Sequence, residues 1–296
     1  MDVSFRQIRA FVAVARLNSF TRAAALLHVA QPTLTVQIRK LEEALSVRLF
    51  ERTSRSVTLT QTGRDLLPVL ARLVQDLDGV IGDVRNQGTG YQGLVRIAAL
   101  PTAAAGLLPR AIKSFRTVHP GADFRIRDVI ARRILSLVEA EEVDLGITGG
   151  PANTGNVDVL LAFEDSMHVV FPQAHPLAEA QAVTPDLLLL YPLIMMDPDT
   201  SVRAVVEAGF HAAGLIPTAA GEATYMMTAA GMVQAGLGIT FLPSSAKEID
   251  AFPNLCSRPI EAVGFVRQIS LVKKSGRPLP SLPAMFARHL REMIGA

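Results

Sequence analysis

The sequence predicts an α/β fold of two Rossmann-like lobes, preceded by a small all-α domain and a long helix. Three features of the 296-residue chain predict it. Short amphipathic helices and a hairpin fill residues 1–60, a heptad-spaced helix follows, and strands alternate with helices from about residue 93. Such alternation is typical of parallel sheets covered by helices. We therefore divide the chain into residues 1–60, 61–88 and 92–296.

The first two helices are defined by apolar periodicity and by capping residues. Apolar residues recur at helical spacing over 5–15, and Asn18 with Ser19 ends this helix. Ser19 or Thr21 can cap a second helix over 22–27. The alanines of the second helix allow a close approach between helices.

A third helix is expected to begin at Gln31 and Pro32, because proline costs little in a first turn. Its inward face carries apolar residues at spacings of four, three and four, namely Leu34, Ile38, Leu41 and Leu45. Residues 49–60 are typical of two short strands around a basic turn, which is a wing. Two helices joined by a tight turn, the second basic and polar outward, match the winged helix-turn-helix geometry that enters a DNA major groove.

A long helix is predicted over 61–88, opened by a capping box from Thr62 to Asp65. Its apolar residues alternate spacings of four and three, namely Leu66, Leu70, Leu73, Leu77, Val80 and Val84. This heptad pattern predicts a coiled coil and a homodimer through this linker helix. The alternative is an amphipathic helix packed on its own domain. Pro68 could kink the helix, and 87–90 is expected to be a hinge.

Residues 92–296 contain two strand–helix–strand–helix–strand runs and a closing helix. The predicted strands are 95–100, 124–130, 145–148, 193–196, 219–223 and 239–242. The predicted helices are 107–118, 134–140, 202–213, 225–235 and 281–294. Two runs predict two lobes, lobe I at about 92–162 with 268–296, and lobe II at about 163–267. Sheets of this kind bind ligands beyond the carboxyl ends of their strands, so we expect a ligand cleft between the lobes.

Charge and cysteine content narrow the class of function. Residues 1–64 have a net charge of +6, and the remainder has −4. A basic head on a mildly acidic body suggests that only the head binds a polyanion such as double-stranded DNA. The single cysteine, Cys256, allows no intrachain disulfide and fits a cytoplasmic location. Arginines interrupt the start of the chain and glycines break the uncharged stretch 223–246, so neither a secretory signal nor a membrane span is expected.

The chain resembles the LysR-type transcriptional regulators along essentially its whole length. The N-terminal segments that carry the resemblance are 11–15, 19–24, 31–35, 37–42, 49–52 and Leu59-Thr60 with Gly63. The C-terminal segments are 106–109, 119–120, 143–147, 175–177 and 235–239. The resemblance implies a winged helix-turn-helix, a linker helix and a two-lobed effector domain similar to periplasmic binding proteins. It also implies a dimer of dimers, hence a homotetramer, near a regulated promoter, with RNA polymerase as a candidate partner.

The resemblance assigns base contacts to the start of the third helix. The Gln31 amide can pair with two edges of adenine, and Pro32 can contact a thymine methyl group. Thr35 matches a position that usually holds a small hydroxyl residue, and Thr33 lies on the same polar face. Val36 departs from the family pattern, which has a long polar residue there. This departure puts one base contact in doubt and favours a thymine methyl.

Further DNA contacts are expected from basic residues of the third helix and the wing. Arg55, at the wing tip, can enter the minor groove or bind phosphate. Phosphate contacts that position the protein without specifying sequence are expected from Arg39, Lys40 and Arg52. The alternatives are a merely solvated basic face and, for Arg52, a salt bridge within the domain.

Candidate effector contacts are Thr102, Ala131, Arg132, Thr148, Thr200, Ser201 and Met227. Thr102 precedes a helix of lobe I, as Thr200 and Ser201 do in lobe II. Two helix N-termini that face a cleft form an anion site, which favours a carboxylate-bearing metabolite. Ala131 and Arg132 stand where the family has Gly followed by Ser or Thr, and the guanidinium favours an acidic or larger ligand. The alternatives are ordinary helix caps at Thr102 and Thr200, a solvated helix start at Arg132 and a core position for Met227.

Three rival functions remain to be weighed. A solute-binding protein would explain the C-terminal part, but the missing export signal and the basic helix-turn-helix argue against it. A regulator that needs no small-molecule effector stays open. We do not expect an enzyme, a cofactor or a metal, because the sequence has no glycine-flanked nucleophilic serine, phosphate loop or metal-spaced His/Cys cluster.

Overall fold

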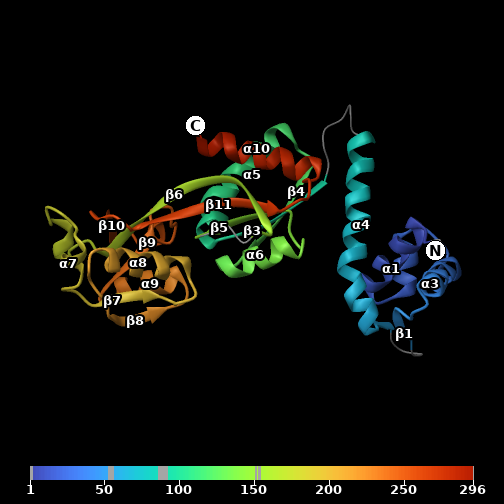
Figure 1. The fold of residues 1–296 in the computed structure, drawn as a ribbon, viewed down its shortest axis with the longest axis horizontal. Coiled ribbons are helices and arrows are strands. Elements are labelled where there is room, and N and C mark those ends of the chain that lie inside the picture. The colour runs from blue at the N-terminus through green and yellow to red at the C-terminus, as the bar shows by residue number, and fades with distance from the viewer. Residues whose placement is uncertain (1–2, 53–56, 86–92, 151, 153–154, 296) are drawn as a thin grey trace. The chain divides into compact units, whose positions relative to one another are not determined.

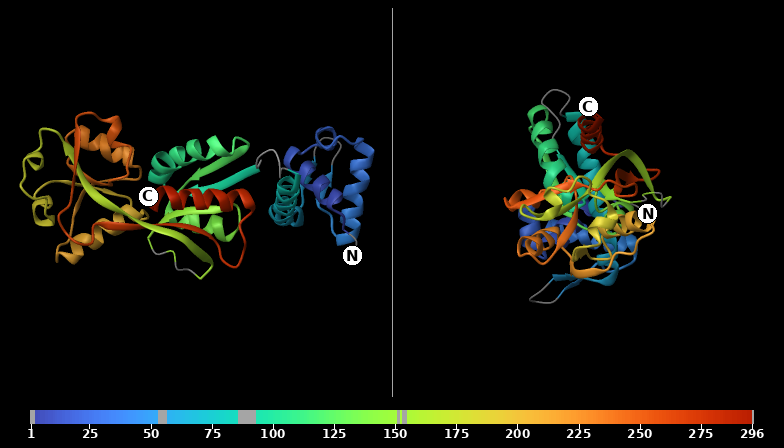
Figure 2. Two further views of the ribbon diagram at one scale, coloured as in Figure 1. Left: turned by 90° about the horizontal axis from the view of Figure 1, so that it is seen from above. Right: turned by 90° about the vertical axis from the view of Figure 1, so that its left-hand side faces the viewer.

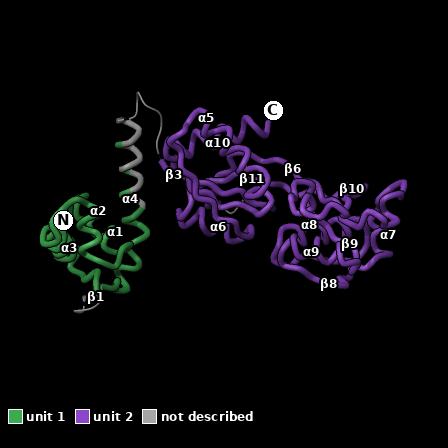
Figure 3. The backbone as a smooth tube through the Cα atoms, turned by 180° about the vertical axis from the view of Figure 1, so that it is seen from behind, with its two compact units in different colours: residues 1–89 green, residues 90–296 purple. Residues whose placement is uncertain are grey.

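The computed structural model describes residues 3–52, 57–85, 93–150, 152 and 155–295. The chain forms two compact units, Met1–Thr89 and Gly90–Ala296 (Figure 3). Each unit has its own hydrophobic core, and unit 2 has one core for each lobe. The part of the chain described here contains no helix long and apolar enough to cross a membrane.

Unit 1 contains the three predicted helices and the predicted hairpin (Figure 1). In chain order its elements are α1 (Phe5–Leu17), α2 (Phe20–Leu26), α3 (Gln31–Leu45), β1 (Phe50–Arg52), β2 (Val57–Leu59) and α4 (Gln61–Arg85). Ser19 caps α2 by accepting from Arg22 N, and Asn18 ends α1 in the left-handed region. The inward face of α3 is confirmed, because Leu34, Ile38 and Leu41 are buried.

The cap of α4 differs from the prediction. The Thr60 hydroxyl, not that of Thr62, accepts a hydrogen bond from Gly63 N at 3.0 Å. The same hydroxyl donates to the Arg48 carbonyl at 2.7 Å, so it joins the start of α4 to the segment before β1. The helix begins at Gln61, as predicted, although its cap is Thr60, and it continues through Pro68.

The apolar residues of α4 serve two surfaces rather than one seam. The residues that pack on the core of unit 1 are Leu66, Leu67, Leu70, Ala71 and Val74. A second stripe, spaced by four residues, is exposed to solvent and consists of Val69, Leu73, Leu77 and Ile81. Leu66 and Leu70 were wrongly assigned to the seam, because they complete their own domain's core. The side chains of Val80 and Val84 lie outside the described part.

Unit 2 has the two predicted lobes of alternating strands and helices (Figures 1 and 2). Lobe I contains β3 (Gly93–Ala99), the π-helical turn η1 (Ala103–Leu107), α5 (Leu108–Val118), β4 (Ala122–Asp128), α6 (Ala131–Glu139), β5 (Leu145–Gly149) and α10 (Ser281–Gly295). Lobe II contains η2 (Pro176–Ala178), α7 (Pro185–Leu188), β7 (Leu193–Met196), α8 (Ser201–Ala212), β8 (Ala219–Ala223), α9 (Met226–Gln234), β9 (Ile239–Pro243), η3 (Ile249–Ala251) and β10 (Leu255–Pro259).

Two long antiparallel strands, β6 (Val157–Pro172) and β11 (Val266–Lys274), connect the lobes (Figure 2). In lobe I, β11 pairs with β5, and in lobe II, β6 pairs with β9 and β10. The strand order is therefore β4-β3-β5-β11-β6-β9-β7-β8. Sequence analysis missed both strands, because acidic and basic residues interrupt their apolar runs. Each strand runs across one of the two predicted boundaries between the lobes, at 162/163 for β6 and at 267/268 for β11.

Candidate functional site

The polar face of α3 is the candidate DNA-binding surface of unit 1. The side chains of Gln31, Pro32, Thr33, Val36, Arg39 and Lys40 are exposed, and Thr35 is half-exposed. They lie on the face opposite the buried Leu34, Ile38 and Leu41, so the helix presents them together. The Arg52 backbone lies in β1, but its side chain and all of Arg55 lie outside the described part.

Hydrogen bonds organise the first turn of α3. The Gln31 Nε2 donates to the Thr35 hydroxyl at 3.3 Å, and this hydroxyl donates to the Gln31 carbonyl at 3.1 Å. Pro32 lies in the first turn, where it removes no helical hydrogen bond. The amide of Gln31 is therefore held against the Thr35 hydroxyl, and its Oε1 accepts no hydrogen bond from the described residues.

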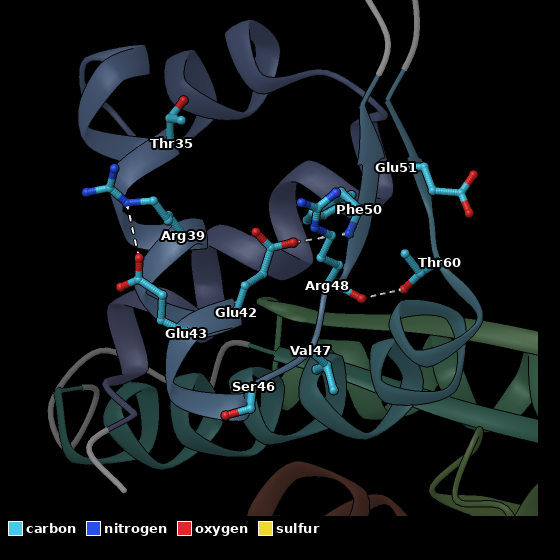
Figure 4. Close-up of a pocket in the computed structure, with 10 residues that line it drawn as sticks. All are labelled: Thr35, Arg39, Glu42, Glu43, Ser46, Val47, Arg48, Phe50, Glu51 and Thr60. Atoms are coloured by element: carbon cyan, nitrogen blue, oxygen red, sulfur yellow. Dashed lines mark hydrogen bonds and ion pairs between the residues drawn. The ribbon is translucent and has the colours of Figure 1, made fainter.

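A hollow of about 620 Å³ separates α3 from the hairpin (Figure 4). Its lining has mixed charge, because Glu42, Glu43 and Glu51 accompany Arg39 and Arg48. The Glu42 Oε1 accepts from Leu49 N at 2.8 Å and from Phe50 N at 3.3 Å, which fixes the hairpin to α3. Arg39 pairs with Glu43 at 3.4 Å on the exposed surface, so it stays able to turn towards a phosphate.

In unit 2 a buried ion pair lies where the two connecting strands pass between the lobes. Arg267 of β11 and Asp165 of β6 are 2% and 6% exposed. The Arg267 Nη2 donates to Asp165 Oδ2 at 2.7 Å, and Nε donates to the same oxygen at 3.2 Å. Burial lowers the pKa of the Arg267 guanidinium, and the carboxylates of Asp165 and Glu248 oppose this shift.

The Asp165 carboxylate is also held by the loop after β9. Ser245 donates to it through Oγ at 2.6 Å and through its backbone N at 3.3 Å. The Ser244 hydroxyl donates at 3.0 Å. With the two bonds from Arg267, both carboxylate oxygens are satisfied, which offsets the cost of burying the charge.

Arg267 brings together two predicted effector residues from different lobes. Its Nη2 donates to the Thr102 hydroxyl of lobe I at 2.7 Å, and its Nη1 lies 3.4 Å from the Ser201 hydroxyl of lobe II. Thr102 is 3% exposed and makes no side-chain cap hydrogen bond to η1, so it is not an ordinary helix cap. A Cβ atom on Gly149 would lie 3.1 Å from the Ser201 Oγ, so Ser201 also packs against the end of β5.

The other predicted effector residues do not join this cluster. Thr200 is an ordinary cap, because its hydroxyl accepts from Arg203 N at 3.2 Å and donates to the Asp197 carbonyl at 2.7 Å. Thr148 is buried, and its hydroxyl has no hydrogen-bond partner among the described residues. Thr148 directly precedes Gly149 in β5, and successive strand residues point to opposite faces of a sheet. Its side chain therefore points away from the face on which Gly149 meets Ser201. Met227 is exposed on α9.

A second contact between the lobes lies at the surface. The Arg132 Nη2 of α6 is 4.0 Å from the Asp199 Oδ1 in the loop before α8, and both side chains are exposed. Ala131 begins α6, whose N-cap residue makes no side-chain hydrogen bond. The described residues contain no group of three or more His, Cys, Asp and Glu that could hold a metal ion.

Sequence reasoning missed Arg267, Asp165, Ser244 and Ser245. The available signal was charge inside an otherwise apolar strand run, at Glu164-Asp165 and again at Arg267. Charged residues are rarely fully buried unless they are paired, so two such positions could have been matched.

Two family descriptions match the chain. "Bacterial regulatory helix-turn-helix protein, lysR family" covers residues 5–64, and "LysR substrate binding domain" covers residues 88–295. The HTH-type transcriptional regulator YbhD of Escherichia coli is 31% identical over 288 residues, which are 97% of this chain and 91% of YbhD. Full-length BenM is 26% identical with a TM-score of 0.62, over 99% of this chain and 97% of BenM. CbnR in complex with its target DNA shares the fold at 22% identity, with a TM-score of 0.67 over 98% of this chain and 99% of CbnR.

Proposed function

The chain belongs to the LysR family of bacterial helix-turn-helix transcriptional regulators, and on this premise we propose a function for each of its two units. Unit 1 binds promoter DNA through the exposed start of α3, with the wing beside it. Unit 2 binds a small effector between its lobes. The observation that carries the proposal is the pairing of an exposed polar recognition helix with a lobe junction where Thr102 and Ser201 share one buried guanidinium.

Gln31, Pro32, Thr33, Thr35 and Val36 are the residues we assign to base contacts. Arg39 and Lys40 are assigned to phosphate, together with Arg52 and Arg55 of the wing. The support for these roles is the exposure of the α3 residues on one helix face. Phosphate contacts supply affinity and salt dependence, whereas base-edge contacts supply sequence preference.

Gln31→Ala tests the base-contact assignment. We expect it to weaken binding to the selected operator by about five- to 150-fold, because a good amide–adenine pair contributes about 1–3 kcal/mol of discrimination. Non-specific binding and the salt slope should stay unchanged, since no phosphate contact is lost. Fluorescence anisotropy with operator and scrambled duplexes over a salt series measures both quantities.

The matched control is Gln61→Ala, which removes an exposed glutamine from the start of α4. It should bind both duplexes as the wild type does. Equal affinity of Gln31→Ala and the wild type for the operator would remove Gln31 from the base contacts.

We assign the exposed stripe of α4 to a homodimer and two such dimers to a homotetramer. The stripe, Val69, Leu73, Leu77 and Ile81, supports the assignment, because four apolar side chains at helical spacing are left uncovered within the protomer. An effector that binds the lobes differently in two arrangements would shift the population between them. This population shift would change the distance between the DNA-binding units of the oligomer, and with that distance the bend of the bound DNA.

A carboxylate of the effector is placed near Arg132, at the start of α6. The Arg132 guanidinium pairs with the exposed Asp199 at 4.0 Å, an interaction that a ligand anion can replace. This location, the uncapped N-terminus of α6 and the nearby Ala131 favour an anion. We assign no catalytic role to any residue, and we expect the protein to act in the cytoplasm, where bacterial promoters are.

Thr102→Val tests the effector site. The hydroxyl is lost while the side-chain shape is kept, so an effector that accepts from Thr102 should no longer change DNA binding. Operator affinity without effector should stay within about twofold of the wild type, because Thr102 lies in unit 2. The measurement is the anisotropy titration with metabolites that alter wild-type binding, found in a screen of small carboxylic acids.

Thr102→Ser is the control, since it keeps the hydroxyl that accepts from Arg267. It should retain the response to the effector. If Thr102→Val and Thr102→Ser respond alike, the hydroxyl is not an effector contact. If Thr102→Val also loses operator binding, the proposed separation of the two units is wrong.

A further inference from the structure

Within the described part of the chain, the hydroxyl protons of Thr102 and Ser201 have no acceptor. Both hydroxyl oxygens accept from Arg267, at 2.7 Å and 3.4 Å. Neither hydroxyl donates to any atom among the residues the structure describes. A hydroxyl has one proton to donate besides its lone pairs, so each has one donor left. These donors come from opposite lobes and are held by one guanidinium.

The positive charge of the Arg267 guanidinium is already compensated by a carboxylate. Asp165 makes two hydrogen bonds to Arg267 and is fixed by three more from Ser244 and Ser245. The Glu248 carboxylate also acts on Arg267, and its Oε2 is buried without a hydrogen-bond partner in the described part of the chain. The Asp165 carboxylate therefore already neutralises the guanidinium it contacts, so a ligand carboxylate would meet no uncompensated positive charge there.

We propose that Asp165 is a specificity-determining residue, which makes the inner end of the effector an uncharged hydrogen-bond acceptor bound by the Thr102 and Ser201 hydroxyls. A carbonyl, amide or hydroxyl oxygen fits there. The carboxylate of the proposed effector then lies at the outer end, near Arg132, whose ion-pair partner Asp199 is exposed and 4.0 Å away. The inference rests on the proposed effector site and orients the ligand within it.

Displacing Asp165 from Arg267 to admit a ligand carboxylate is the competing arrangement. It would break the two hydrogen bonds that Arg267 donates to a carboxylate that is 6% exposed. Leaving a buried charge unpaired is strongly unfavourable. The outer Arg132 offers the same attraction without that cost.

The test uses formate and formamide, which match in size and differ in charge, and the full-length chain with its threonine methyl groups isotopically labelled for NMR. In the wild type, formamide should shift the Thr102 methyl signal, and formate should have no more effect than chloride. In Asp165→Asn, formate should bind about ten- to a hundredfold more tightly than in the wild type, because a carboxylate beside the guanidinium is gone. Asp165→Asn/Arg267→Gln should lose that gain.

A shift of the Thr102 signal by formate in the wild type, equal to that by formamide, would overturn the proposal. This comparison needs no variant, so it decides the matter even if Asp165→Asn fails to fold. Unchanged formate affinity in a folded Asp165→Asn would also overturn it. If neither probe reaches Thr102 in any protein, the effector site itself is contradicted, and operator binding by the same samples shows whether the DNA-binding part of the proposed function stands.

Discussion

Replacing Arg267 with glutamine is expected to destabilise unit 2 by about 3–5 kcal/mol, because it leaves the buried Asp165 carboxylate without its cation. Asp165 is 6% exposed, so water cannot replace the lost partner. The three remaining hydrogen bonds from Ser244 and Ser245 limit the loss but bring no charge. Chemical denaturation of the full-length chain measures the change, with unit 1 as an internal reference.

The matched control is Arg127→Gln, which breaks an ion pair with Glu142 of similar length, 2.6 Å against 2.7 Å. Those side chains are 43% and 39% exposed, so the expected loss is below about 1 kcal/mol. Asp165→Asn/Arg267→Gln should recover much of the lost stability, since no buried charge stays unpaired. Equal losses for Arg267→Gln and Arg127→Gln would show that the buried pair of Arg267 and Asp165 stabilises the protein no more than an exposed ion pair does.

Replacing Gly63 with alanine is expected to disrupt the junction of the hairpin and α4. A Cβ atom there would lie 2.3 Å from the Leu49 carbonyl oxygen, a backbone atom that cannot rotate away. Overpacking of this kind costs about 1–3 kcal/mol or more, which should lower the melting temperature of unit 1 and weaken operator binding. Unit 2 should be unaffected, because Gly63 lies in the other unit.

Gly231→Ala provides the comparison. Gly231 lies inside α9 and an added Cβ atom would meet nothing within 4 Å, so alanine should stabilise that helix by about 0.5–1 kcal/mol. Limited proteolysis and thermal melts of both variants separate the two units. A Gly63→Ala protein that melts and binds as the wild type does would mean that β1 and α4 are not packed as described.

Local signals predicted most of the secondary structure. The Gln31-Pro32 start of α3, the Ser19 cap and the alternation of strands and helices in both lobes each depend on a few neighbouring residues. The long strands β6 and β11 were missed because their pairing joins residues about a hundred positions apart, as Asp165 and Arg267 are. Burial of such a pair depends on the whole fold, which spacing within one segment does not reveal.

The candidate site was predicted in part for the same reason. Thr102 and Ser201 were found as polar residues at helix starts, but the guanidinium that connects them comes from a distant strand. Thr200 has the same local pattern and yet only caps α8. In α4, heptad spacing could not tell the residues that complete the domain's own core from the exposed stripe, since one helix carries both.

Unit 1 is expected to bind one DNA sequence in preference to others. DNase I footprinting of the wild-type protein on the DNA next to its own gene, over a salt series, tests it most directly. We expect discrete protected segments and a steep fall in affinity with salt, because basic residues of α3 and the wing release counterions from phosphates. Uniform protection with no preferred segment at any salt concentration would contradict it.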